Sequence, residues 1–205
     1  ALGRQEQPRR GPDPRLPVME YRTGSVLRRT LRVRYPSGAG RVVLRTELDW
    51  ERDLEPVEVS ADGETWTFAL AAQRPFLYFK VCLREADGNL RWAVGPNSLV
   101  FMTVEGVRDV YPYFTGPATG SLTEDLKRDS AILGREHLLR VYLPAGYHEN
   151  PLRRFPVLYM QDGKNLFFPE EAFLGREWNV DEALMLLDEM NMIDRVVVVG
   201  VFSGD

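Results

Sequence analysis

The chain has 205 residues, and its 26 Lys and Arg against 30 Asp and Glu give a formal net charge of -4. With 44% hydrophobic and 27% charged residues, it has the composition of a packed globular protein, which excludes collagen-like and globally disordered classes. Its apolar runs are much shorter than the roughly 20 residues that span a bilayer, so we expect no transmembrane helix and no membrane partner. One cysteine excludes an internal disulfide, and with only two histidines it cannot complete a usual structural zinc site.

The N-terminal segment differs from the rest of the chain in charge and composition. Residues 1–17 are rich in Pro, Gly and Arg and have almost no apolar side chains, which predicts a disordered basic tail. A nucleic-acid-binding arm is an alternative interpretation, but no interleaved aromatics or base-reading module follows, so we expect no nucleic-acid partner. The apolar core of a secretory signal is also missing, which favours a cytoplasmic location.

Residues 18–105 have the pattern of a β-sandwich, in which short runs that alternate apolar and polar residues are separated by turn residues. The runs 31–35 and 42–48 flank Pro-Ser-Gly-Ala-Gly and predict a hairpin. Two further strand pairs are predicted around Asp62-Gly63 and Asp87-Gly88, namely 57–59 with 65–70 and 77–83 with 90–94.

Several motifs of this region, LxxxLDW, DGETWTFAL, FLYFKVCL, DGNLRW and GPN, occur in an order that resembles immunoglobulin-like modules that precede glycan-active and esterase domains. The resemblance implies that exposed aromatics can stack on sugar rings, and the candidates are Trp50, Tyr78 and Trp92. The alternative is that the aromatics belong to the core. Trp66 is in phase with apolar neighbours and is expected in the core, and Trp92 is also in phase with Leu90 and Val94.

The remaining residues predict a second domain of a different class. Residues 106–119 show neither the alternation of a strand nor the spacing of a helix. They predict a linker whose aromatics pack across the domain junction. Residues 120–205 alternate strands with a helix, which indicates α/β organisation. Asn179 is the expected N-cap, with Glu182 as its capping-box partner. Val196–Val199 is expected to be a central strand, covered on both faces. The helix carries an apolar stripe expected to be core, made of Val180, Ala183, Leu184, Leu187 and Met190.

The motifs VYLPAGY, RFPVLYMQDGKNLF, EWNVDEAL and VVVVGV resemble the N-terminal half of the putative-esterase family of α/β-hydrolases, which includes enterochelin esterase, feruloyl esterases and S-formylglutathione hydrolase. The resemblance implies a serine carboxylic-ester hydrolase that works through an acyl-enzyme without metal or organic cofactor. It also implies an oxyanion hole after Asp162, in which the Lys164 amide is the donor and Gly163 allows close approach of backbone to substrate.

The chain departs from this family in its catalytic residues. It contains no GxSxG nucleophile elbow, and Ser203 lies in a sequence of the wrong spacing. His137 and His148 precede any such elbow, and Cys82 lies in the predicted sandwich. We therefore expect a truncated form that lacks nucleophile, acid and histidine and is inactive alone, with a small-molecule or glycan ester as substrate if completed.

The same family comparison predicts that the strand Val157–Gln161 has an exposed edge, through which the chain would form a homodimer or bind a complementing C-terminal half. Two alternatives from other classes stay open. In the first, the chain is a non-catalytic carbohydrate-binding protein that uses the sandwich. In the second, it is a regulatory subunit that completes a second polypeptide carrying the GxSxG motif.

Overall fold

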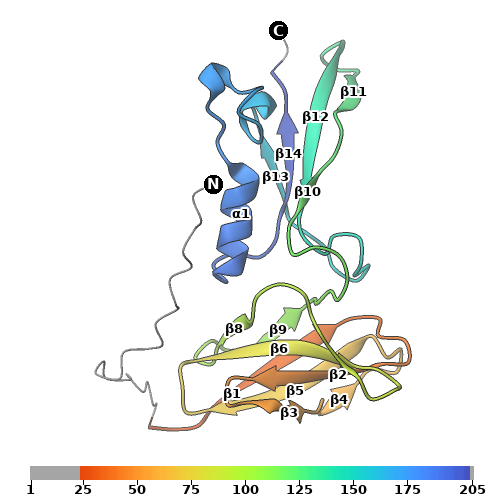
Figure 1. Ribbon diagram of the computed structural model, residues 1–205, viewed down its shortest axis with the longest axis vertical. Coiled ribbons are helices and arrows are strands. Elements are labelled where there is room, and N and C mark those ends of the chain that lie inside the picture. The colour runs from red at the N-terminus through yellow and green to blue at the C-terminus, as the bar shows by residue number, and fades with distance from the viewer. Residues whose placement is uncertain (1–23, 204–205) are drawn as a thin grey trace, which may run out of the picture.

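The computed structural model describes residues 24–203, which form two units stacked along the long axis of the molecule (Figure 1). The basic tail expected at residues 1–17 lies outside the described residues. None of the helices between residues 24 and 203 is long and apolar enough to cross a membrane. The first unit contains strands β1 (Leu27–Arg34), β2 (Arg41–Thr46), β3 (Asp49–Leu54), β4 (Glu58–Val59), β5 (Thr65–Ala72), β6 (Phe76–Arg84), β7 (Leu90–Trp92), β8 (Ser98–Phe101) and β9 (Val107–Val110).

Two sheets enclose the core of the first unit. One has the strand order β4-β5-β1-β9, and the other has the order β3-β2-β6-β7 with β8 also paired to β6. Alternate side chains of each strand point inward, so that Leu31 on β1, Leu44 on β2, Phe68 on β5 and Phe79 on β6 are fully buried. Trp66 is 7% exposed and belongs to this core, as its phase predicts.

The strand pairs predicted around Asp62 and Asp87 are confirmed, since β4 pairs with β5 and β6 pairs with β7, both antiparallel. The predicted hairpin of runs 31–35 and 42–48 is wrong. β1 pairs with β5 and β9, whereas β2 pairs with β3 and β6, so the intervening turn crosses from one sheet to the other. Alternation identifies the buried face of a strand but not the strand beside it.

The segment 106–119, for which we expected a linker, contains β9. This strand pairs in parallel with β1, with Thr30 opposite Val107 and Val33 opposite Val110. Four alternating residues are too few to distinguish a strand from a loop by periodicity. Beyond β9, Phe114 packs into the core of the first unit, so this part of the segment lies across the junction.

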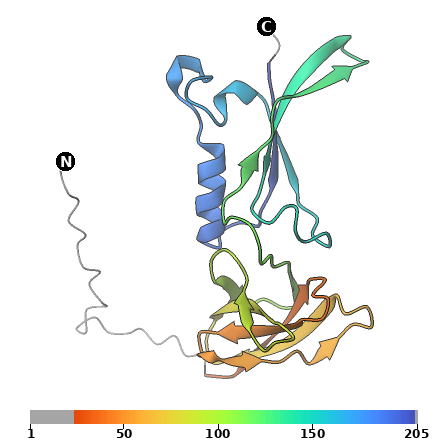
Figure 2. The ribbon, with the colours of Figure 1, turned by 45° about the vertical axis from the view of Figure 1, so that its right-hand side comes forward.

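The second unit is built on one mixed sheet of order β10-β12-β14-β13, with β11 also paired to β12. β14 lies between β12 and β13 and runs antiparallel to β12 and parallel to β13, and helix α1 lies beside the sheet (Figure 2). The elements are β10 (Ser121–Leu122), β11 (Leu126–Ser130), β12 (Arg135–Leu143), β13 (Val157–Met160), 3-10 turns η1 (Gly163–Asn165) and η2 (Phe173–Gly175), α1 (Val180–Glu189) and β14 (Val197–Val201).

Helix α1 starts where the sequence predicts, but its cap and its packing differ. Asn179 has φ 48° and makes no side-chain cap hydrogen bond, so the predicted capping box is absent. No residue of the helix is buried, and Met190 is 56% exposed. Only Val180 and Leu184 of the predicted stripe pack against the small core of this unit. The other three members, Ala183, Leu187 and Met190, are not part of this core, and Ala183 and Met190 are exposed, so the prediction that the stripe is core is only partly correct.

Three polar side chains fasten the two units together. Glu149 accepts hydrogen bonds from the Phe114 and Thr115 amides, both 2.7 Å long, and from the Tyr35 hydroxyl at 2.9 Å. The buried Asn150 amide donates to the Arg34 and Pro112 carbonyls. Asn191 is bonded to the backbone of residues 97 and 99. The junction is therefore held at two places, one at the adjacent residues Glu149 and Asn150 and one at Asn191.

Candidate functional site

The Asp162-Gly163-Lys164 turn follows directly on β13, at the carboxyl end of the parallel pair β13–β14. Asp162 is left-handed, with φ 56° and ψ 47°, and Gly163 opens the short turn η1. Gly163 is buried, and a Cβ placed on it would lie 2.7 Å from the Phe202 ring and 3.1 Å from the Phe202 amide nitrogen. The turn therefore packs directly on the end of β14, and only glycine fits at this position.

The backbone after this turn is tied to the loop that leads into α1. The Asn165 side chain accepts a hydrogen bond from the Phe173 amide at 2.8 Å. The backbone carbonyl of Asn165 accepts one from the Trp178 amide at 2.7 Å. The Leu166 carbonyl accepts from the Val180 amide at 3.1 Å. These bonds hold η1 between the sheet and the start of the helix, so its backbone is fixed on both sides.

A buried arginine on β12 contacts Phe202, the residue on which this turn packs, and no sequence motif pointed to it. Arg140 is opposite Gly200 of β14, and its guanidinium lies 4.9 Å from the Phe168 ring centroid and 5.3 Å from that of Phe202. It forms ion pairs of 2.7 Å with Asp125 and 2.9 Å with Glu171. Burial lowers the pKa of Arg140, but hydrogen bonds to these carboxylates outweigh it and raise the pKa above its ordinary value.

Two carboxyl groups near the start of α1 have pKa values above their ordinary ones. Burial is the main cause that raises the pKa of Asp181 to about 6, and a hydrogen bond with Glu182 adds to it. Burial, followed by the charge of Glu182, also raises the pKa of Glu177. One oxygen of each group is buried without a hydrogen-bond partner among the described residues. The described part of the chain contains no cluster of His, Cys, Asp and Glu able to hold a metal ion.

The nucleophile and base residues considered from the sequence are dispersed. His137 lies on β12, His148 stacks edge-on against Tyr147, and Ser203 is an exposed residue after β14. Cys82 lies on β6 of the other unit, where burial raises the pKa of its thiol to about 12. No hydrogen bond joins Ser203 to either histidine within residues 24–203, so this region contains no assembled Ser-His pair.

The candidate sugar-stacking residues all lie on the β3-β2-β6-β7 sheet. Trp92 is 42% exposed and Tyr78 is 37% exposed, and alternation places both on the outer face of this sheet, because Trp92 is opposite Cys82. Trp92 is therefore not a core residue. The Arg45 guanidinium lies 5.4 Å from its ring centroid and occupies one face of the ring. Trp50 is half-buried on β3, and its carbonyl accepts a hydrogen bond from Arg45 at 2.7 Å.

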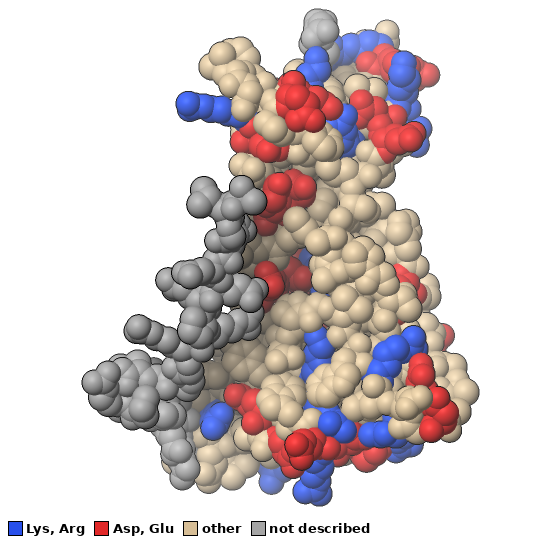
Figure 3. Space-filling model, in the orientation of Figure 1, with Lys and Arg blue, Asp and Glu red and all other residues tan. Residues whose placement is uncertain are grey.

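The second unit exposes an unusual amount of apolar side chain. β13 is the last strand of its sheet, and Val157, Leu158 and Tyr159 on it are 49%, 46% and 72% exposed. Phe173 and Leu174 of η2 are 77% and 81% exposed. In Figure 3 the surface between the charged tip of this unit and the first unit is mostly uncharged. Contiguous exposed apolar surface is a common feature of protein contact faces.

Comparison with known families gives a match over this second unit. Residues 130–205 match the family model described as "Putative esterase". The match supports an esterase family for this part of the chain. It includes β13, the turn at Gly163, α1 and β14, which carry the sequence motifs quoted above.

Two other comparisons add little to this result. No curated protein matches the chain. Among solved structures, a family 15 glucoamylase from Hypocrea jecorina aligns at 14% identity and TM-score 0.35, over 44% of this chain and 18% of the enzyme. A gamma-CGTase from alkalophilic Bacillus clarkii aligns at 19% identity and TM-score 0.29, over 41% of this chain and 14% of that protein. The chain thus spans less than a fifth of either structure.

Proposed function

We propose that the second unit is the N-terminal part of an α/β-hydrolase domain that cleaves carboxylic esters with a serine nucleophile, and that the first unit is its immunoglobulin-like accessory module. The family match over residues 130–205 carries this proposal. Support also comes from the parallel pair β13–β14 and from the tight turn at its carboxyl end, because ligands of open α/β sheets bind at such ends.

In this proposal the Asp162-Gly163-Lys164 turn supplies part of the oxyanion hole. The Lys164 amide would stabilise the negative charge that develops on the carbonyl oxygen of the ester during attack. The contacts of Gly163 with Phe202, and of Asn165 with the loop before α1, would keep this donor in place while the charge forms. The ion pairs of Arg140 with Asp125 and Glu171 would help to hold the same region in place.

The nucleophile, acid and histidine of the reaction would come from another segment, because the 205 residues contain no GxSxG. The free edge of β13 and its exposed apolar side chains are where a complementing segment, or a second copy of the chain, would add a strand. The 205-residue chain by itself should therefore neither hydrolyse esters nor react with a fluorophosphonate, which phosphonylates activated serines.

The decisive experiment labels a lysate of the natural source with a fluorophosphonate probe and then captures this chain for intact-mass measurement. A labelled species whose modified serine lies in a GxSxG segment, covalently continuous or co-purified with this chain, is the expected result. If only an unlabelled species of about 23.5 kDa is recovered, the hydrolase proposal fails.

The oxyanion assignment has its own test in the completed, labelled enzyme. Lys164→Pro removes the proposed amide donor, whereas Lys164→Ala keeps it and serves as the matched control. We expect kcat to fall by about 10²-fold to 10³-fold in the proline variant alone. Circular dichroism checks that both variants fold, and equal activity of the two folded variants would remove Lys164 from the oxyanion hole.

Recognition of glycan by the sandwich is a second candidate function, favoured by the exposure of Trp92 and Tyr78 on one sheet face. Sugar rings stack on such aromatic side chains. Trp92→Ala and Trp50→Ala should each weaken glycan-array binding if this function exists. The buried Trp66 is unsuitable as a control, so the exposed Phe173 of the second unit serves instead as Phe173→Ala.

A further inference from the structure

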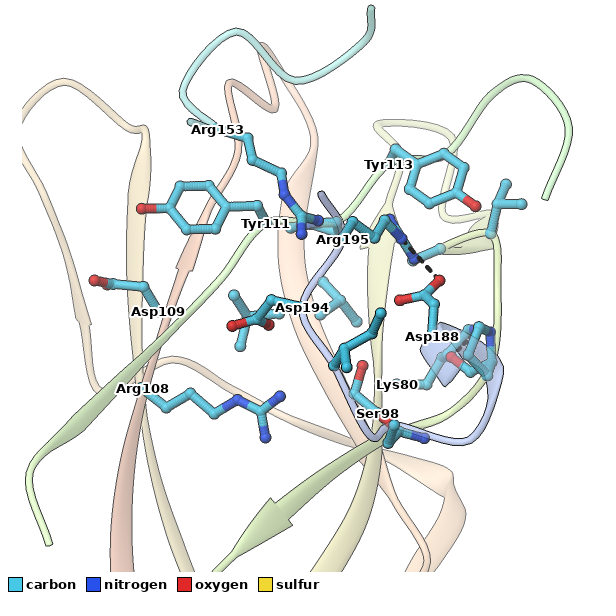
Figure 4. Close-up of a pocket in the computed structure, with 18 of the residues that line it drawn as sticks. Lys80, Ser98, Arg108, Asp109, Tyr111, Tyr113, Arg153, Asp188, Asp194 and Arg195 are labelled. Carbon is cyan, nitrogen blue, oxygen red and sulfur yellow. Dashed lines mark hydrogen bonds and ion pairs between the residues drawn. The ribbon is translucent and has the colours of Figure 1, made fainter. Parts of the chain in front are cut away.

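A cavity of about 300 Å³ lies between the two units, and Figure 4 shows the side chains around it. Its lining includes three arginines, Arg108, Arg153 and Arg195. Carboxylates line the same cavity, and one of them, Asp188, forms an ion pair of 2.9 Å with Arg195. Charges of both signs are mixed in this lining, so it indicates no particular ligand. A more specific arrangement surrounds Arg140 of the second unit, which is outside this lining.

Arg140 is the one charged residue that is buried among the described residues of the second unit, where it is 8% exposed. Its guanidinium donates to Asp125 from Nε at 2.8 Å and pairs with the same carboxylate through Nη2 at 2.7 Å. It donates to Glu171 from Nη1 at 2.9 Å. The planar fork of arginine binds two carboxylates and stacks on rings in a fixed geometry, unlike the compact ammonium of lysine. A buried arginine with these bonds therefore fixes the segments that carry its partners.

One of these segments follows the turn at Gly163 in the chain. Glu171 lies between η1 and η2, and the Glu171 and Ala172 amides both donate to the Phe168 carbonyl, at 3.2 Å and 3.1 Å. The Phe168 ring centroid lies 4.9 Å from the Arg140 guanidinium. Phe168 and Glu171 are thus held together as one local turn, and both contact the same guanidinium.

The turn at Gly163 packs on β14, and Arg140 contacts the end of this strand as well. Arg140 lies opposite Gly200 in the sheet, and a Cβ on Gly200 would be 2.9 Å from the Leu166 side chain and 3.5 Å from the Gly163 Cα. The absence of a side chain at residue 200 therefore lets the turn lie directly on the strand. Phe202, which packs on Gly163, has its ring centroid 5.3 Å from the Arg140 guanidinium. The guanidinium thus contacts both the strand end on which the turn packs and the segment that follows the turn.

We infer that Arg140 is a positioning residue for the turn at Gly163: it holds the strand end beneath the turn and the segment after it in one arrangement, and so fixes the direction of the Lys164 amide. Asp125 anchors the guanidinium beside the start of β11, and Glu171 couples it to the segment after the turn. The catalytic consequence rests on the proposed esterase function, in which this amide stabilises the oxyanion. A displacement of about 1 Å in such a group lowers a rate by about 10²-fold.

Hydrogen exchange of the 205-residue chain tests the positioning without any catalysis. Arg140→Met should speed exchange of the Asn165 and Phe173 amides, which are hydrogen-bonded beside the turn, by about ten-fold or more, because the charge-assisted bonds that hold this segment are lost. Glu171→Gln leaves the other carboxylate in place, so it should fold and show the same effect to a smaller extent. The exposed Arg135→Met on the same strand is the matched control. Equal protection in the wild type and both variants, or a loss spread evenly over β12 and β14, would overturn the inference.

The completed enzyme gives a second, kinetic readout, with its active sites counted by fluorophosphonate titration. Arg140→Met should lower kcat per site by about 10-fold to 10²-fold and change KM by less than about two-fold, because the oxyanion hole acts on the transition state. A variant that is only less stable would lose active sites but keep kcat per site. Unchanged kcat per site, or a rise in KM alone, would contradict the positioning role. If no esterase activity exists, the proposed function fails, whereas the exchange result still decides whether Arg140 holds the turn.

Discussion

The two units of this molecule differ in how they bury their apolar side chains. In the sandwich, two sheets face each other, and residues such as Leu31, Val42 and Phe79 have no exposed surface. In the second unit a single sheet has one helix beside it, its buried cluster is limited to Tyr142, Leu166, Phe167 and Val198, and strand β13 has a free edge. A sheet needs cover on each apolar face, and only the first unit provides it within the described residues. The first unit has the features of an independent domain, whereas the described part of the second leaves apolar surface uncovered.

Truncation of a side chain should show the largest difference in stability between the two units. Phe68→Ala removes a fully buried ring from the sandwich and should cost about 3 to 5 kcal/mol of unfolding free energy. Val157→Ala on the half-exposed edge strand should change it by less than about 0.5 kcal/mol. Denaturant unfolding of both variants measures the difference, and similar losses would mean that the edge of β13 is covered in solution.

The second unit should nevertheless be closely packed at Gly163. A methyl group at Gly163 would overlap the Phe202 ring and backbone, so Gly163→Ala should destabilise this unit by about 1 to 3 kcal/mol. Gly24→Ala, where nothing lies within 4 Å of the added carbon, is the control. Hydrogen exchange of the β14 amides reports the loss, and unchanged protection in Gly163→Ala would contradict the packing described.

The junction between the units should depend on pH through Glu149. Burial raises the pKa of Glu149, but hydrogen bonds from Thr115 and Phe114 outweigh it and lower the pKa below its ordinary 4.5. Because the folded pKa lies below the unfolded one, Glu149 stabilises the junction at neutral pH, and this contribution is lost as the pH falls below 4.5 and through the folded value.

Glu149→Gln should therefore be less stable than the wild type by about 1 kcal/mol at pH 7, and the difference should shrink as the pH falls from 4.5 to 3. Thermal unfolding from pH 3 to 7 measures this convergence. The exposed Glu58→Gln serves as the control and should stay parallel to the wild type over the whole range. Parallel curves for Glu149→Gln would show that the carboxylate does not act at the junction.

The smallest effect is expected at Cys82. Burial raises the pKa of its thiol to about 12, so the reactive thiolate is scarce and shielded in the native state. Iodoacetamide at pH 8 should leave Cys82 unmodified until the sandwich opens. Rapid alkylation of the folded protein would show that the first unit is not closed. Since the single cysteine of the chain lies in the sandwich, its labelling measures the opening of the sandwich independently of the second unit.

Different parts of the structure were accessible from the sequence to different degrees. Alternation in DGETWTFAL and FLYFKVCL identified strands and the burial of Trp66, because each pattern is local. It did not identify strand partners, so β1 and β2 were wrongly paired. The turn at Gly163 was found through a family motif, but Arg140 was missed, because its carboxylate partners lie 15 and 31 residues away. The cavity arginines belong to three separate segments and meet only in the folded chain.

The parallel pairing of β9 with β1 determines how a pulling force would pass through this molecule. β1 is near the start of the described chain, and β9 is followed directly by the segment that leads to the second unit. Tension between the two ends would act along these strands in opposite directions, so the hydrogen bonds between them would be loaded together in shear rather than broken one at a time. The sandwich is therefore expected to resist stretching along this axis, and its rupture would be governed by the unfolding rate.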